Sequence, residues 1–221
     1  MPPAKIITYI SDWIILLPFL VGAVIYKKLQ WDSRIIFFMV FLGITPQMLH
    51  FFYNHSLIET ISYNIYIPFE FTLLGILFYK QVSKRNTKLT LTVTYLFYAI
   101  LSIYFFTQVG ITGKFISEWI LTNNLLYLFW IGLFLYETFQ FDSGELTLHR
   151  PFFWYLIGIL IYSACASIVF SLWHKILSSE KNSILKYLWS VQNICNIIMY
   201  LLFTVGLFLE FRNSKRKLPE C

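Results

Sequence analysis

Long runs of hydrophobic residues follow one another along the chain, and short polar stretches separate them. Each run approaches or exceeds the roughly 20 apolar residues that an α-helix needs to cross a bilayer. None shows the alternating segments of about ten residues that are typical of a membrane β-barrel. The pattern therefore predicts an all-α, polytopic membrane protein with seven transmembrane helices. The predicted spans cover residues 6–26, 34–53, 61–79, 89–107, 116–138, 152–174 and 184–211.

The composition supports this class of protein. Of the 221 residues, 58% are hydrophobic and only 13% are charged, whereas soluble domains contain about 25% charged residues. The formal net charge of +6 is compatible with nucleic-acid binding, but the basic residues lie between the apolar runs, as determinants of membrane topology do. We therefore expect no nucleic-acid partner.

The distribution of Lys and Arg predicts the orientation. The first, third and fifth connections and the C-terminal tail hold 12 basic residues, and the N-terminus and the other connections hold 5. Because positive residues favour the cytoplasmic side, the N-terminus is expected outside and the C-terminus in the cytoplasm. We expect a multi-pass protein of the cell inner (plasma) membrane.

The connections are too short to form further domains, and the longest covers about residues 139–151. We expect residues 1–211 to form a single seven-helix transmembrane domain and residues 212–221 to form a short basic cytoplasmic tail. An activity must then reside within the bilayer or depend on a partner.

Glu70 is the one charged residue in the run ISYNIYIPFEFTLLGILFY, residues 61–79. Ionisable side chains inside a membrane span usually face the bundle interior or a water-filled cavity, and they often serve function. On a helix, Tyr63, Tyr66 and Glu70 share one stripe, because positions three, four and seven apart lie on the same face. Glu70 is therefore the main candidate for a ligand contact.

Other polar residues occupy the predicted outer halves of several spans. The orientation places them on the same side of the membrane as Glu70, so they predict an outward-facing polar pocket, whereas the inner halves look plainer. The candidate ligand-binding residues are Glu70, Tyr63, Tyr66, Asn64, Gln47, His50, Asn123, Gln192, Asn193 and Asn196. Polar side chains also join helices to one another, at about 0.6 kcal/mol each, so each amide has a structural alternative.

Three resemblances bear on function. Seven spans are also typical of rhodopsins, but the last span lacks a central lysine for retinal. Pro46-Gln47, with one proline in each of the first three spans, resembles the PQ-loop and SWEET-type transporters, which implies Glu70 as a proton or cation site. His50, His55 and His174 with Asp12 and Glu118 resemble the ligands of the alkaline-ceramidase-like membrane hydrolases, which implies a metal-dependent hydrolase. The His50–His55 spacing of five departs from that pattern.

A broader resemblance covers most of the chain. Tyr63-Asn64-x-Tyr66 with Glu70-Phe71, and Trp189-x-x-Gln192-Asn193-x-x-Asn196, are similar to a group of small seven-helix inner-membrane proteins of Bacteroidota. The resemblance implies a fold and a location, and it supplies no activity.

We expect receptor-like binding of a small polar or amphipathic ligand, with signalling through a membrane or cytoplasmic partner. A secondary transporter and a metal-dependent hydrolase are the alternatives. The leading hypothesis includes membrane lipid around the bundle and an unknown small-molecule ligand, and it includes no catalytic residue, metal or cofactor.

Overall fold

The structure is a computed structural model, and it describes residues 3–53, 57–109, 117–141, 149–177 and 182–216. Within these ranges all regular elements are helices. They are α1 (Pro3–Trp13), α2 (Leu16–Ile25), the short 3₁₀ helix η1 (Tyr26–Lys28), α3 (Trp31–Tyr53), α4 (Leu57–Gln81), α5 (Arg85–Val109), α6 (Ser117–Phe141), α7 (Pro151–Leu177) and α8 (Asn182–Arg216).

Seven stretches of these helices are long and apolar enough to cross a membrane, which confirms the predicted spans. They are Lys5–Lys28, Trp31–Leu49, Ile61–Gln81, Arg85–Thr107, Ser117–Gln140, Pro151–Leu172 and Tyr187–Lys215. The chain is thus an integral, multi-pass membrane protein. Its last helix reaches Arg216, so the first part of the predicted tail continues α8.

The first span is broken, although the sequence predicted one continuous helix. α1 ends at Trp13 and α2 begins at Leu16. Pro18 has no amide hydrogen with which to bond the Ile14 carbonyl, which instead accepts from Leu17 at 3.0 Å. Pro46 and Pro68, by contrast, lie inside α3 and α4 without ending them.

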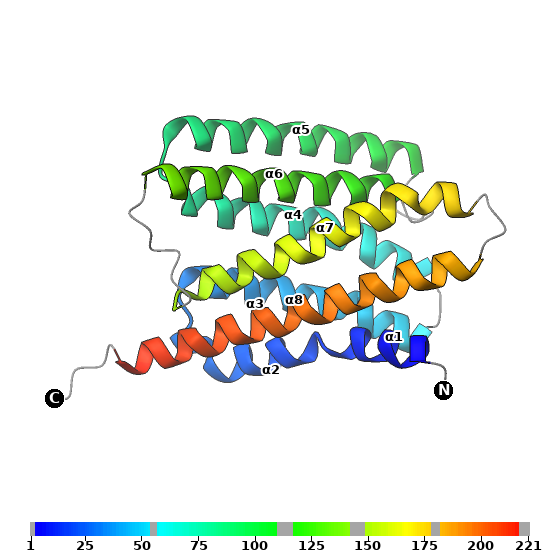
Figure 1. Cartoon of the computed structure of the whole chain (residues 1–221), viewed down its shortest axis with the longest axis horizontal. Coiled ribbons are helices and arrows are strands. Elements are labelled where there is room, and N and C mark those ends of the chain that lie inside the picture. Colours follow the sequence, from blue (N-terminus) through cyan, green and yellow to red (C-terminus); the bar gives the residue numbers. More distant parts are fainter. Residues whose placement is uncertain (1–2, 54–56, 110–116, 142–148, 178–181, 217–221) are drawn as a thin grey trace.

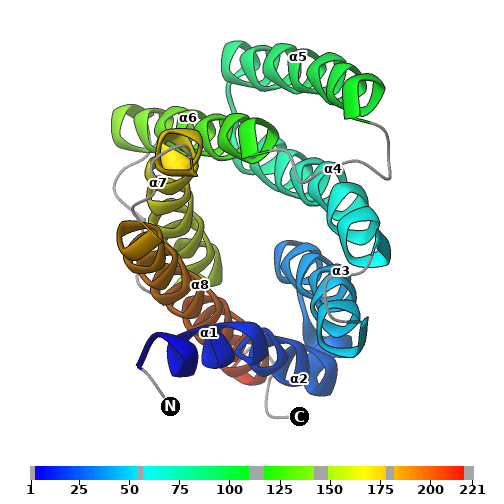
Figure 2. The ribbon, with the colours of Figure 1, turned by 90° about the vertical axis from the view of Figure 1, so that its right-hand side faces the viewer.

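The spans are arranged as a ring when the bundle is seen along its length (Figure 2). α3, α4, α6, α7 and α8 follow one another around it, and the α1–α2 pair closes it between α8 and α3. α5 lies outside the ring against α4 and α6 (Figures 1 and 2). Six spans therefore surround a common centre, and the seventh supports it from outside.

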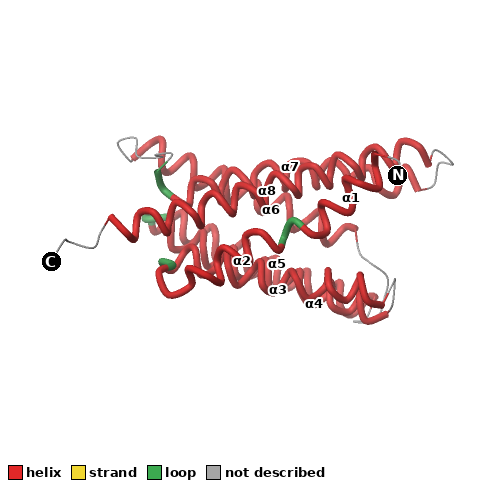
Figure 3. Tube along the Cα trace, turned by 90° about the horizontal axis from the view of Figure 1, so that it is seen from below, coloured by secondary structure: helices red, strands yellow, loops and turns green. Residues whose placement is uncertain are grey.

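The helices alternate in direction along the chain. α1 begins at one end of the bundle and α8 finishes at the other (Figure 3). The two chain ends lie at opposite ends of the bundle because the number of spans is odd. The alternation also places the first residues of α4, α6 and α8 at the same end as α1. We call this the N-terminal end, and we call the opposite end the C-terminal end.

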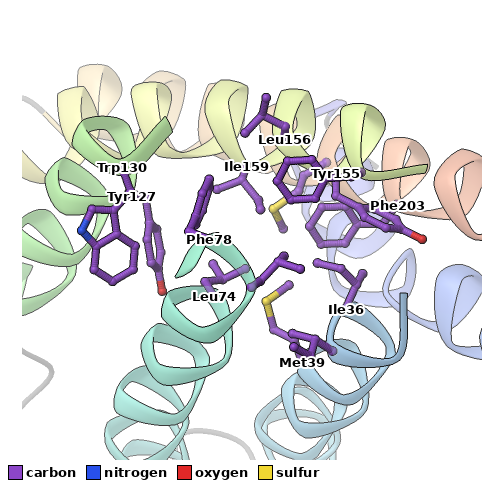
Figure 4. Packing of buried hydrophobic residues seen from close by; sticks show 14 of the residues in the cluster. Ile36, Met39, Leu74, Phe78, Tyr127, Trp130, Tyr155, Leu156, Ile159 and Phe203 are labelled. Atoms are coloured by element: carbon purple, nitrogen blue, oxygen red, sulfur yellow. The ribbon is translucent and has the colours of Figure 1, made fainter. Parts of the chain in front are cut away.

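A layer of apolar side chains fills the ring in its C-terminal half (Figure 4). Each member is at most 3% exposed, so the layer is densely packed. It comprises Ile36 and Met39 from α3, Leu74, Leu77 and Phe78 from α4, Ile159 from α7, and Phe203 and Leu207 from α8. We call this the apolar layer.

Candidate functional site

Glu70 lies inside the ring, surrounded by tyrosines. The hydroxyl of Tyr66, one turn earlier on α4, donates a hydrogen bond to its carboxyl group. Four further tyrosines from four other helices interact with it electrostatically: Tyr98 of α5, Tyr127 of α6, Tyr162 of α7 and Tyr200 of α8. We call Glu70 and these five tyrosines the Glu70 cluster.

Glu70 is partly exposed in this position. Tyr66 and Tyr162 are also partly exposed, whereas Tyr98, Tyr127 and Tyr200 are buried. The partners of Glu70 come from α7 and α8 across the ring, and the outward-facing neighbour Phe69 is 56% exposed on the other side of α4. The exposed part of Glu70 therefore faces the interior of the ring rather than the surrounding lipid.

The described surroundings of Glu70 contain no positive charge that would balance its carboxylate. Among the described residues, no Lys, Arg or His side chain interacts with Glu70. Its one hydrogen bond comes from a phenol. A carboxylate that is removed from bulk water without a cation or several donors is costly. The described residues thus surround Glu70 with aromatic rings and phenol hydroxyls but supply no opposite charge.

Aromatic packing fixes the side of the cluster next to α5. The Phe71 ring lies 3.5 Å from that of Tyr98, 5.5 Å from that of Tyr127 and 4.5 Å from that of Trp130, measured between centroids. Figure 4 shows the Tyr127 and Trp130 rings together beside α4. The Tyr98 hydroxyl accepts a hydrogen bond of 2.9 Å from the Trp119 indole. α5 therefore contributes to the cluster although it lies outside the ring.

Two of the predicted amides support tyrosines of the cluster. Gln192 forms a hydrogen bond with the Tyr162 hydroxyl. Asn123 donates to the Tyr127 hydroxyl at 3.2 Å from one turn earlier on α6. Both amides are buried. They orient the phenols around Glu70, and their role in ligand binding stays a prediction.

Asn193 and Asn196 instead join α8 to α1. The Asn193 amide donates to the Thr8 hydroxyl at 3.0 Å, and the Asn196 amide donates to the Ser11 hydroxyl at 3.0 Å. The sequence correctly indicated that this stripe of α8 faces protein, but its neighbour is the broken first span. The structure does not bring either amide into contact with Glu70.

The remaining predicted residues differ in their burial. Asn64 is buried, while Tyr63 and Gln47 are partly exposed. Tyr63 interacts with Tyr162 and Tyr200, so it lies at the N-terminal side of the cluster. His50 belongs to α3, but its side chain lies outside the described part, as do His55 and the His174 side chain. Within the described part, no three His, Cys, Asp or Glu side chains are grouped to hold a metal ion.

A second polar group near the C-terminal end was missed by the sequence reasoning. The Ser33 hydroxyl lies 2.8 Å from the Tyr155 hydroxyl and donates to Glu210 at 3.4 Å. Since a serine hydroxyl has one proton, Tyr155 is then the donor to Ser33. All three side chains are at most 3% exposed. The expectation that the halves toward the C-terminal end are plain was therefore wrong. These residues lie near span ends, where no sequence pattern indicates burial.

The apolar layer separates this group from the Glu70 cluster. Along α8, Tyr200 of the cluster precedes Glu210 by ten residues, about 15 Å of helix, and Phe203 and Leu207 lie between them. Along α7, Ile159 lies between Tyr155 and Tyr162. The ring thus holds two polar levels, and the apolar layer lies between them.

Glu137 was also missed, and its partners explain its burial. One carboxylate oxygen accepts from the backbone N–H groups of Ser83 at 2.6 Å and Lys84 at 2.9 Å, just before α5. These donors belong to a helix N-terminus, where negative charge is favourable. Glu137 of α6 therefore caps a neighbouring helix.

Glu70 could be predicted from the sequence because its charge is unusual in a span, and Tyr66 because it lies one turn away. Tyr98 and Tyr162 could not be distinguished by sequence from the other aromatic residues of the spans. Comparisons with family models, with curated proteins and with solved structures found no match to this chain.

Proposed function

We propose that this membrane protein binds a small polar or amphipathic ligand inside its ring, with Glu70 as the main contact. The observation that carries the proposal is Glu70, a partly exposed residue whose carboxyl group lies among tyrosines of five helices. The ligand would enter from the N-terminal end, where Tyr63 is also partly exposed.

The energetic cost of placing the Glu70 carboxylate in a membrane span favours a ligand-binding role over a purely structural role for this residue. A single hydrogen bond to a charged group contributes about 1.5–3 kcal/mol, while a carboxylate inside a membrane span costs at least about 2.5–3.5 kcal/mol. A structural acid would be expected to have several donors, as Glu137 does with two backbone amides. A ligand that enters the ring would supply the missing partner.

Receptor-like signalling is the form that the apolar layer favours. The layer lies between the Glu70 cluster and the C-terminal end, and its described side chains are all apolar and buried. A bound ligand would then act by shifting α4, α7 and α8, which carry most of the cluster. In the proposed orientation the N-terminal end faces outward in a cell inner membrane, and a membrane or cytoplasmic partner detects the shift.

A secondary transporter is the second candidate, and the buried group of Ser33, Tyr155 and Glu210 favours it. A transporter needs polar side chains on both sides of its central site, and this group supplies them toward the C-terminal end. The apolar layer would then have to open during each cycle.

Thiol accessibility tests the proposed recess. All three native cysteines are first replaced (Cys165→Ala, Cys195→Ala, Cys221→Ser), and a single thiol is introduced by Tyr63→Cys or, as the matched control, by Leu74→Cys in the apolar layer. We expect a neutral, water-soluble methanethiosulfonate to modify the Tyr63→Cys protein in nanodiscs and to leave the Leu74→Cys protein unmodified, as measured by intact mass. An unreactive Tyr63→Cys thiol in a folded protein would exclude an open recess.

Uptake separates the two candidates. Proteoliposomes that contain the protein are loaded with buffer and exposed to radiolabelled choline, which serves as a small polar test solute. The receptor-like form predicts no uptake above empty liposomes. Uptake that Glu70→Gln abolishes would instead establish a transporter.

A further inference from the structure

We propose that the ligand of the Glu70 cluster is an organic cation, an alkylated ammonium group with an apolar body, recognised by the Glu70 carboxylate and the surrounding tyrosine rings. This inference rests on the proposed function and specifies its ligand class. It follows from the negative charge of Glu70, from the tyrosine rings around it and from the apolar layer next to the cluster.

An ionised Glu70 would be neutralised by a positive partner. Glu70 is the acidic group shared by the interactions of Tyr66, Tyr98, Tyr127, Tyr162 and Tyr200. No basic side chain among the described residues balances it. An anionic ligand would add repulsion inside a low-dielectric bundle, whereas a cation would neutralise the carboxylate.

The rings specify an organic cation rather than a small inorganic one. The face of an aromatic ring attracts a cation within about 6 Å, and quaternary ammonium groups are bound by cages of several such rings. Five tyrosines interact with Glu70, and the rings of two of them, Tyr66 and Tyr162, are partly exposed. A metal ion would need several oxygen or nitrogen ligands close together, and the described residues hold no group of three or more His, Cys, Asp or Glu side chains.

The level below the cluster is suited to an apolar ligand body. Leu74 lies one turn beyond Glu70 on α4 and is 1% exposed, and Ile159 and Phe203 lie at the same level of α7 and α8. These side chains offer no hydrogen bond. A ligand with its charge at Glu70 would therefore place alkyl or aromatic groups against the apolar layer.

Reagents of opposite charge test this class. In the cysteine-replaced background with Tyr63→Cys, labelling rates in nanodiscs are measured for a trimethylammonium, a sulfonate and a neutral hydroxyethyl methanethiosulfonate. Each rate is divided by the rate of the same reagent with free 2-mercaptoethanol. We expect the normalised cation rate to exceed the normalised anion rate at least tenfold, and we expect Glu70→Gln to reduce this ratio to near one.

Glu118→Gln is the matched control, because Glu118 is an exposed carboxylate at the same end of the bundle. It should leave the ratio within twofold in 0.15 M salt, where the screening length is about 8 Å. Tyr162→Leu, which removes one ring and keeps the carboxylate, provides a second variant if Glu70→Gln does not fold. It should lower the ratio at least threefold.

Ligand protection provides an independent readout. Choline and its neutral isostere 3,3-dimethylbutan-1-ol have almost the same shape and differ in charge. We expect millimolar choline to slow labelling by the neutral reagent at least fivefold and the isostere to have no effect. Equal protection by both would overturn the cation class.

The outcomes separate this inference from the proposed function. If the neutral reagent labels the Tyr63→Cys protein while the charge ratio is the same with Glu70 and with Gln at that position, the recess exists and the cation class is wrong. If no reagent reacts, both are wrong.

Discussion

At the scale of single residues, Gly206 shows how closely the chain is packed near the C-terminal end. A Cβ atom at this position would lie 2.4 Å from the Tyr155 ring. The ring cannot move aside easily, because it is fully buried and its hydroxyl is hydrogen-bonded to Ser33. The absence of a side chain at Gly206 is therefore needed for α7 and α8 to approach each other.

We expect Gly206→Ala to lower the free energy of unfolding by about 1–3 kcal/mol, as overpacking of a filled interior does. Gly132→Ala is the matched control, because an added Cβ there meets nothing within 4 Å. Unfolding by SDS, followed through tryptophan fluorescence in detergent, measures both. Equal stability of the two variants would show that the Tyr155 ring adapts at little cost.

The sequence identified part of the site at this scale. Glu70 was found because a carboxylate in an apolar run is unusual, and Tyr66 because it lies one turn away. Tyr162 and Tyr98 carried no such signal, since a tyrosine in a membrane span has many possible positions. The stripe of Asn193 and Asn196 was recognised, but a helical period does not specify which helix faces it, and the structure shows that it is α1.

At the scale of helices, Glu137 connects two elements. It lies on α6 and accepts from backbone amides at the start of α5. α5 lies outside the ring and packs only against α4 and α6 among its larger contacts. This cap therefore adds a polar attachment to a helix that is otherwise held by side-chain packing.

We expect Glu137→Ala to lower the free energy of unfolding by about 1 kcal/mol, the typical cost of losing a helix cap. Exposed amides at Ser83 and Lys84 can bond to water instead, which limits the cost. Glu118→Ala, at the opposite end of α6, is the control and should change stability by less than half as much. Hydrogen exchange should also increase at the start of α5 in the Glu137→Ala protein alone. Unchanged exchange there would argue against the capping role.

At the scale of the whole molecule, the number and extent of the spans could be predicted because length and hydrophobicity alone determine them. The order of the helices around the ring could not, since it depends on which faces fit together. The break in the first span was indicated by Pro18, but Pro46 and Pro68 carry the same signal and leave their helices continuous. Proline thus indicated three possible breaks, and the structure has a break at one of them, near Pro18.

The orientation of the molecule in the membrane is tested with the native Cys221 in a Cys165→Ala, Cys195→Ala background. An impermeant maleimide should fail to label intact cells that produce this protein and should label it after permeabilisation, because the basic end is expected inside. A thiol from Lys114→Cys, in a connection expected outside, should react in intact cells when Cys221→Ser is also present. The reverse result at both positions would invert the orientation and place the Glu70 recess on the cytoplasmic side.

The interruption at Ile14 and Ile15 divides the first crossing into two rods with different attachments. The rod at the N-terminal end, α1, is joined by hydrogen bonds to Asn193 and Asn196, close to the Tyr200 that interacts with Glu70. The other rod, α2, lies against α8 and α3, and Pro18 weakens the main-chain ladder between the rods. A tilt of α8 would therefore displace α1, which is hydrogen-bonded to it, more freely than α2, which is also packed against α3.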